Sequence, residues 1–254
     1  MMVFRNIEGL QKYNICMPDM ESRIPGLSAM LRIKDEAEYL VQSLDSITPW
    51  MDEIVICLHG EQKDDSAEIA LSYQSWNPKK IKVYLYPFDS FPNGPGHDQQ
   101  TRNSVYERAY FYNWCLSKTT RKYVCKWDGD MVALPETGKR IRELLEHYNL
   151  IYLTGAEMVS ETHQSIKPFT ASDPRIFKVA DHTFYETGPY CEQLRHRYKV
   201  YAQLVIPGHQ FKHFKWCKSE QSITKAWPDN WREIPHFQNL VERKQEGRRY
   251  ARPE

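Results

Sequence analysis

Short apolar runs alternate with amphipathic segments along residues 27–158 of the sequence, an order that leaves few folds open to the chain. In a segment such as 36–47, apolar residues recur every three or four positions, which indicates a helix, whereas the runs between such segments are typical of buried strands. Alternating strands and helices form a mostly parallel sheet with helices on both faces. We therefore predict an α/β fold. The predicted strands are 27–34, 52–60, 80–88, 121–127 and 149–158, and the predicted helices are 36–47, 64–76, 101–117 and 138–148.

The second half of the chain, from about residue 160, is less regular. We predict a helix that begins at Cys191, a strand at 197–206, and a charged end at 241–254 that frays or forms a surface helix. A chain of 254 residues commonly forms one α/β domain with a single core, and we expect that here.

Composition limits the classes of function. Lys and Arg (34) nearly balance Asp and Glu (33), which argues against a strongly basic nucleic-acid binder but leaves a local basic patch open. The six cysteines form no metal-binding spacing, so we interpret them as reduced core thiols. No run approaches the roughly 18 apolar residues of a membrane span, and the first residues lack a signal-peptide core. We expect a cytoplasmic protein with at most a peripheral contact at the inner face of a membrane.

Two aspartates, Asp128 and Asp130, follow the predicted strand 121–127 in the stretch YVCKWDGDMVAL. Ligands of open α/β sheets bind beyond the carboxyl ends of the strands. In an extended chain the two carboxylates would point to one side, and Gly129 would let a ligand approach the backbone. A shared Mg²⁺ or Mn²⁺ ion that also binds phosphate oxygens would relieve their repulsion. Taken alone, Asp-Gly also fits a purely structural turn.

Three cations accompany the acidic pair. Arg32 ends the first predicted strand, Arg102 begins the predicted helix 101–117, and Lys126 lies in the strand before Asp128. Cations at strand and helix ends suit the binding of phosphates, so we assign all three to a nucleotide-binding set. Surface ion pairs are the alternative for the two arginines.

Four segments resemble, in this order, the N-terminal half of family 2 glycosyltransferases of the bacterial polysaccharide type: SAMLRIKDEAEYLVQSLDSI, DEIVICLHGEQKDDSAEIA, QTRNSVYERA and VCKWDGDMV. The resemblance spans residues 26–135 and implies a Rossmann-like GT-A fold. It also implies a metal-dependent transfer of a sugar from a nucleotide-sugar donor to a glycan or lipid-linked acceptor. Mn²⁺ or Mg²⁺ would neutralise the departing diphosphate. Asp130 would bind the metal directly, whereas Asp128 would contact the ribose or sugar, or bind the metal through water.

The resemblance also divides the chain. It implies a nucleotide-sugar-binding half at 24–158, an acceptor and catalytic-base half at 159–216 and a C-terminal extension at 217–254. Relatives carry a histidine about six residues after a proline, and His213 follows Pro207 at this interval. His213 would then bind the metal, and Lys215 would face the diphosphate. A surface loop with lysines beside buried aromatic residues is the alternative.

An inverting transferase needs a general base that deprotonates the acceptor hydroxyl. The resemblance places an acidic residue before a helix in the second half, for which the candidates are Glu186 and Glu192, followed by Glu161 and Asp181. We prefer Glu186 on spacing, because Glu192 also fits a charge that merely suits a helix N-terminus.

One position departs from the family pattern. Leu58 stands where relatives carry an acid that contacts the nucleobase, so base recognition would fall to His59, Asp64 or Asp65. This departure leaves open a non-catalytic nucleotide- or glycan-binding scaffold on the same fold. A nucleotidyltransferase is a further alternative, but LRIKDEAEYL lacks the glycine-rich phosphate loop that this class predicts.

Overall fold

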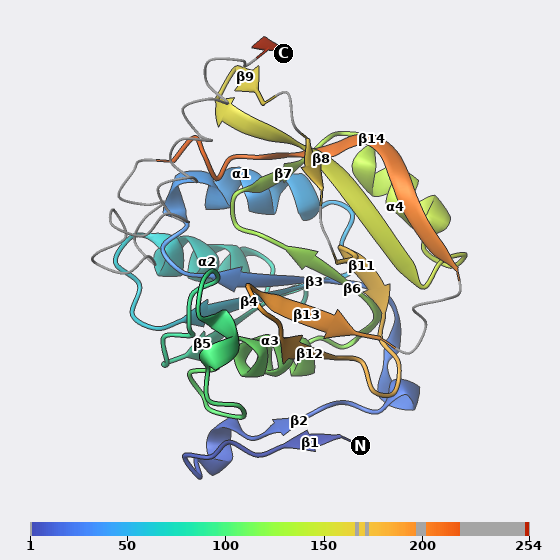
Figure 1. The fold of residues 1–254 in the computed structure, drawn as a ribbon. Helices are drawn as coiled ribbons and strands as arrows, with labels where there is room; N and C mark the ends of the chain where they lie inside the picture. The colour runs from blue at the N-terminus through green and yellow to red at the C-terminus, as the bar shows by residue number, and fades with distance from the viewer. Residues whose placement is uncertain (1, 166–167, 171–172, 197–201, 219–251, 254) are drawn as a thin grey trace.

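The computed structural model describes residues 2–165, 168–170, 173–196, 202–218 and 252–253 (Figure 1). The helices are α1 (Ala37–Ile47), α2 (Ser66–Trp76), α3 (Arg108–Ser117) and α4 (Thr137–Leu144), with short 3-10 turns at Gln11–Tyr13, Met20–Ser22 and His97–Gln99. The strands are β1 (Val3–Phe4), β2 (Ile15–Cys16), β3 (Ile24–Ile33), β4 (Glu53–His59), β5 (Ile81–Tyr86), β6 (Arg121–Trp127), β7 (Met131–Ala133), β8 (Leu150–Ser160), β9 (His163–Gln164), β10 (Phe169–Thr170), β11 (Ile176–Lys178), β12 (Phe184–Thr187), β13 (Glu192–Arg195), β14 (Gln203–His213) and β15 (Arg252–Pro253).

The described strands include an 11-stranded sheet with a parallel centre. β3 pairs in parallel with β4 and β6, β4 with β5, and β14 with β8. β11 is antiparallel to both β6 and β8, and β7 is antiparallel to β14. The predicted mixed α/β fold with a mostly parallel sheet is therefore confirmed.

Helices cover both faces of the sheet. Successive residues of a strand point to opposite sides, so each strand has side chains to bury on both faces. α1, α2 and α4 pack on one face, and α3 packs on the other, behind the β12–β13 hairpin (Figure 1). Buried strand residues on the first face include Leu31, Ile33, Ile56, Leu58 and Trp127, and those on the α3 face include Met30, Val55, Cys57 and Val124. Arg32 and Lys126 alternate with the first set and so point toward α3, where both lie over the ring of Tyr112.

One predicted helix is wrong in its described part, and another begins later than predicted. The helix expected from Cys191 is strand β13, in which Glu192 and Leu194 are buried and the residues between and after them are more exposed, an alternation typical of a strand. The helix expected at 101–117 begins only at Arg108. Asn103 has a left-handed φ of 59°, which a helix does not accommodate, and residues 101–107 form turns.

The C-terminal expectations lie mostly outside the described residues. Of the extension predicted at 217–254, the structure describes 217–218 and 252–253, and the strand predicted at 197–206 is described from Gln203 onward as the start of β14. Within the described parts of the chain, no helix is long and apolar enough to span a membrane.

Candidate functional site

The candidate site lies where the parallel strands β3 and β6 end at one edge of the sheet. After β6 the chain turns, and the backbone N–H of Met131 donates to the carbonyl of Asp128 at 3.2 Å. The buried Trp127 indole N–H holds this turn, since it lies 3.0 Å from the Met131 carbonyl and 3.2 Å from the Ser43 hydroxyl. A turn, rather than the extended segment that we expected, therefore carries Asp128 and Asp130.

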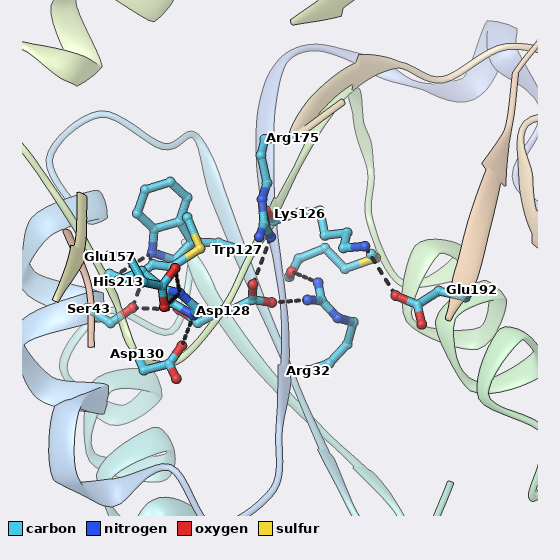
Figure 2. Close-up of polar contacts among 12 residues, drawn as sticks. Arg32, Ser43, Lys126, Trp127, Asp128, Asp130, Glu157, Arg175, Glu192 and His213 are labelled. Carbon is cyan, nitrogen blue, oxygen red and sulfur yellow. Dashed lines mark hydrogen bonds and ion pairs between the residues drawn. The ribbon is translucent and has the colours of Figure 1, made fainter. Parts of the chain in front are cut away.

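Asp128 is held by two arginines (Figure 2). Its Oδ1 accepts from Arg32 of β3, and its Oδ2 accepts from Arg175, which precedes β11, at 2.7 Å. The arginine side chains are 3% and 5% exposed, whereas that of Asp128 is 29% exposed. Burial by itself would raise the pKa of Asp128, but Arg175 and Arg32 lower it below its ordinary value. Asp128 is therefore an ionised bridge with one edge open to solvent.

Asp130 has different partners. Its Oδ1 lies 3.4 Å from Nε2 of His213 at the end of β14, and its Oδ2 lies 2.6 Å from Nζ of Lys218. Burial would raise the pKa of Asp130, but Lys218 and His213 lower it well below its ordinary value. The two aspartates thus have separate cations supplied by the protein, which differs from the single shared ion that we expected.

His213 is oriented by Glu157. The two residues are opposite each other on the parallel strands β14 and β8, and the imidazole Nδ1 lies 2.9 and 3.1 Å from the two Glu157 oxygens. This hydrogen bond turns Nε2 toward Asp130 (Figure 2). Burial would lower the pKa of His213, but Asp130 and Glu157 raise it to about 9.

Asp130 and His213 fit a divalent cation once the imidazole, which its raised pKa keeps protonated at neutral pH, releases the Nε2 proton. Adjacent ligands of Mg²⁺ at about 2.1 Å from the ion lie roughly 3 Å apart, close to the 3.4 Å separation here. A carboxylate behind the imidazole, as Glu157 provides, is typical of metal-binding histidines. Asp128 fits less well as a direct ligand, because arginines hold both of its oxygens.

The protein would not complete such a metal site alone. Among the described residues, no group of three His, Cys, Asp or Glu side chains is placed to hold a metal ion. Phosphate oxygens of a substrate and water would have to supply the remaining ligands, which is common for Mg²⁺.

Gly129 has a role different from the one we expected. A Cβ at this position would lie 2.8 Å from Cδ1 of Ile33 and 3.0 Å from Cβ of Glu36. The glycine thus allows the turn to pack closely against the end of β3 and the start of α1. Close packing within the protein, rather than space for a ligand, explains the glycine.

Lys126 and Glu192 form a buried ion pair of 3.1 Å on the α3 side of the site (Figure 2). The ammonium also lies 5.3 Å from the ring centre of Tyr112 and 5.7 Å from that of Tyr185. Burial would raise the pKa of Glu192, but Lys126 and then Arg108 lower it. Its second oxygen, Oε2, is buried and has no hydrogen-bond partner. A buried carboxylate oxygen without a partner is rare in folded proteins and is one mark of a functional group.

Glu186 lies on the other face of the β12–β13 hairpin. Glu186 is opposite Gln193, and Thr187 is opposite Glu192, so Glu186 and Glu192 project to different sides. Glu186 is paired with the exposed Arg195. The alternative bases Glu161 and Asp181 are exposed. Of the two glutamates, the structure thus places Glu192 beside Lys126 of the site, whereas Glu186, which we preferred on spacing, contacts Arg195.

The residues proposed for base recognition have other contacts. His59 is 5% exposed and packs 4.6 Å from the ring centre of Phe111, between β4 and α3. Asp64 accepts the backbone N–H groups of Ala37 and Ser66, each at 3.0 Å, and so stabilises the starts of α1 and α2. Asp65 is exposed next to the start of α2.

Two predicted cations are exposed. Arg102 lies in the turns before α3 rather than at a helix start. Lys215 lies in the turn after β14, with its ammonium 5.2 Å from the ring centre of Trp216. The structure brings together Arg32, Lys126, Asp128, Asp130, Glu192 and His213 from the predicted set, and it places His59, Arg102, Glu186 and Lys215 in other surroundings.

Sequence reasoning missed four residues of the site: Glu157, Arg175, Lys218 and Arg108. For Glu157 there was a signal, since it is a single acid within the apolar strand 150–159. Arg175 and Lys218 each reach the acidic pair from a distant segment. Arg108 marks the real start of α3, and its charge helps to lower the pKa of Glu192.

No family model matches the sequence, and no curated protein does. The fold is similar to that of S. aureus TarS, a GT-A-type glycosyltransferase. One TarS structure superposes with a TM-score of 0.51 at 13% identity and covers 79% of this chain, which spans 38% of that one. For TarS 1-349, the TM-score is 0.48 at 13% identity, with 79% of this chain and 63% of that one covered. The chain thus has a fold similar to that of TarS and spans less than two thirds of these TarS chains.

Proposed function

We propose that the chain is a metal-dependent, inverting glycosyltransferase that moves a sugar from a nucleoside-diphosphate donor to a hydroxyl of a glycan or lipid-linked acceptor. One observation carries the proposal: Asp130 with His213, and Glu192 with its free oxygen, lie on opposite sides of Asp128 at the edge of a glycosyltransferase-type sheet. The first pair suits a metal-bound diphosphate, and Glu192 suits an acceptor hydroxyl.

Residues at the donor end would bind and orient the nucleotide sugar. Mn²⁺ or Mg²⁺ held by Asp130 and His213 would neutralise charge on the departing nucleoside diphosphate. Arg32 and Arg175 keep Asp128 ionised, and its exposed edge can accept hydrogen bonds from hydroxyls of the ribose or the sugar.

Glu192 would act as the general base. It takes the proton of the acceptor hydroxyl while that oxygen attacks the anomeric carbon from the side opposite the diphosphate. The new carbon–oxygen bond forms as the bond from the anomeric carbon to the β-phosphate oxygen breaks, and the nucleoside diphosphate leaves with that electron pair. Lys126 holds the other Glu192 oxygen and so orients the base.

Two substitutions on one hairpin test this assignment. E192Q should lower kcat by about 10²- to 10⁴-fold, the typical contribution of a general base, with unchanged binding of the donor. E186Q is the matched control, and its kcat should stay within about threefold of the wild-type value. A thermal-shift panel of nucleoside diphosphates and nucleotide sugars, with and without Mn²⁺, first identifies the donor for this assay. Full activity in E192Q, or equal losses in both variants, would exclude Glu192 as the base.

A nucleotide- or glycan-binding scaffold is the second candidate. The observation that favours it is that cations of the protein already pair with both aspartates, while Leu58 packs in the core where relatives carry the base-binding acid. A scaffold would bind a nucleotide or glycan in the same panel but show neither donor hydrolysis nor transfer. In that case D130N would change binding alone.

A further inference from the structure

Lys218 is the buried cation of the site that the proposed reaction does not yet use. It lies five residues after His213, and its ammonium contacts Asp130 Oδ2 at 2.6 Å and the carboxylate of Glu36 at the start of α1. Its side chain is 5% exposed. Burial would lower the pKa of Lys218, but Asp130 and Glu36 raise it, so the group is a full positive charge.

The turn that carries Lys218 is fixed to the site. The backbone N–H of Phe214 donates to the carbonyl of Asp130 at 2.8 Å, and its ring stacks on Tyr39 of α1 with centres 4.7 Å apart. The N–H of Cys217 closes the turn on the carbonyl of Phe214 at 2.9 Å. These contacts direct Lys218 inward, whereas Lys215 on the same turn is exposed.

A metal ion at Asp130 and this ammonium would interfere with each other. The metal would bind Oδ1 beside His213 while the ammonium holds Oδ2. Two positive charges on one buried carboxylate repel strongly, because little solvent screens them. A diphosphate changes this balance, because its oxygens can bind the metal and the ammonium at the same time. Glu36 offers Lys218 a second carboxylate, so that the ammonium can leave Asp130 without losing every partner.

We propose that Lys218 is an internal counter-ion of Asp130, which competes with the divalent cation and transfers to the donor diphosphate when metal and donor bind together. The inference rests on the proposed function, since it assigns Lys218 to the diphosphate of the same site. Metal alone then binds weakly, and metal and diphosphate strengthen each other's binding by one common factor, as linkage requires. Lys218 sets the size of that factor.

Mn²⁺ titrations of the full chain test the competition. Free Mn²⁺ is measured by electron paramagnetic resonance, without nucleotide and then with UDP, GDP, ADP or CDP, against blanks without protein. In wild type, the nucleotide that binds should raise the Mn²⁺ affinity by a factor in the usual range of about 5- to 150-fold. K218M should bind Mn²⁺ alone more tightly and bind the nucleotide more weakly at saturating Mn²⁺. Its coupling factor should then fall to about threefold or less.

Three further variants separate charge from structure. K218Q keeps a hydrogen-bond donor between the two carboxylates and should behave as K218M, which gives a second reading if K218M folds poorly. K218R keeps the charge and should retain the coupling. K215M removes the exposed lysine of the same turn and should match wild type.

Competition predicts opposite changes in the affinity for Mn²⁺ alone and the affinity for the nucleotide, whereas a disrupted site would weaken both. If K218M and K218Q leave the affinity for Mn²⁺ alone unchanged, or weaken both affinities together, the proposal is wrong. The Mn²⁺ titrations and the proposed function can fail separately. Without any nucleotide binding in wild type, the transferase assignment fails, yet the comparison with Mn²⁺ alone still decides the competition. If K218M binds Mn²⁺ and nucleotide as wild type does while E192Q abolishes sugar transfer, the competition proposal is wrong and the transferase proposal is supported.

Discussion

At the scale of single residues, the partners of a carboxylate decide which chemistry it can perform. Asp128, Asp130 and Glu192 all have a lowered pKa and are ionised at neutral pH. Arginines occupy both oxygens of Asp128, which suits a structural and substrate-orienting role. Glu192 has one oxygen on Lys126 and one without a partner, which suits a base.

K126M should move the acid limb of the kcat/KM profile to higher pH. Burial raises the pKa of Glu192, and Lys126 is the strongest influence that lowers it. In wild type the depressed pKa keeps the base ionised, so activity is lost only as the pH falls below the ordinary glutamate pKa of about 4.3. Without Lys126 the pKa rises, and the loss begins nearer neutrality. The pH–rate profile measures this shift.

K122M is the control for this profile, because Lys122 lies on the same strand β6 and precedes the site. Its acid limb should coincide with that of wild type. If the acid limb of the K126M profile lies at the same pH as in wild type, Glu192 is not the base that titrates.

At the scale of elements, the pairing of β8 with β14 positions the candidate metal ligand. The two strands are parallel, with Glu157 opposite His213 and Gly155 opposite Phe211. A Cβ on Gly155 would lie 2.3 Å from the Phe211 ring, which is fully buried and packs against the rings of Trp127 and Phe169. The close approach of these strands therefore depends on a glycine.

G155A should destabilise the protein by about 1–3 kcal/mol, the usual cost of overpacking a core, because the buried Phe211 ring could move away only by displacing Trp127 or Phe169. Denaturant unfolding measures the change. V205A is the control on the same strand pair, since Val205 of β14 is 61% exposed, and it should stay within about 0.5 kcal/mol of wild type. Equal stabilities of G155A and wild type would show that the two strands separate easily.

At the scale of the whole molecule, the ion pairs of Asp128 connect strands that are distant in sequence. Arg32 belongs to the central strand β3, Asp128 follows β6, and Arg175 precedes β11, which is antiparallel between β6 and β8. The same bridge therefore holds the parallel part of the sheet to its antiparallel part. It also defines the boundary between the two ends of the candidate site (Figure 2).

D128N should reduce the free energy of unfolding toward the lower end of the roughly 3–5 kcal/mol typical of a broken buried ion pair, since Asp128 itself is 29% exposed. Two buried guanidinium groups would lose their counter-charge. D89N, which removes the exposed partner of Lys34, is the control and should cost about 0–1 kcal/mol. Urea unfolding compares the two, and similar losses would contradict a special role for the bridge.

Acid should weaken the same bridge. The folded pKa of Asp128 is depressed, so its stabilising effect is present above the ordinary aspartate pKa of about 3.9 and is lost as the pH falls below it. The stability difference between wild type and D128N should therefore shrink in acid.

Apolar periodicity was enough to predict most of the fold. Each of the five predicted strands and the helices α1, α2 and α4 is present near its predicted position, because burial of one face imposes a local repeat on the sequence. The placement of Asp128 and Asp130 at a strand end followed from the same repeat. The prediction failed at β13 and at residues 101–107, where four alternating residues and a left-handed Asn103 are weak local signals.

The sequence by itself determined the α/β sheet, the edge at which ligands would bind and the acidic pair at that edge. Only the tertiary structure decided which cation each carboxylate meets: Lys126 for Glu192, Arg175 for Asp128, and His213 with Lys218 for Asp130. The reason is physical. A repeat of two or 3.6 residues reports which side of an element is buried, whereas the charge state of a buried acid depends on groups about 50 to 90 residues away, which only the folded chain brings within contact.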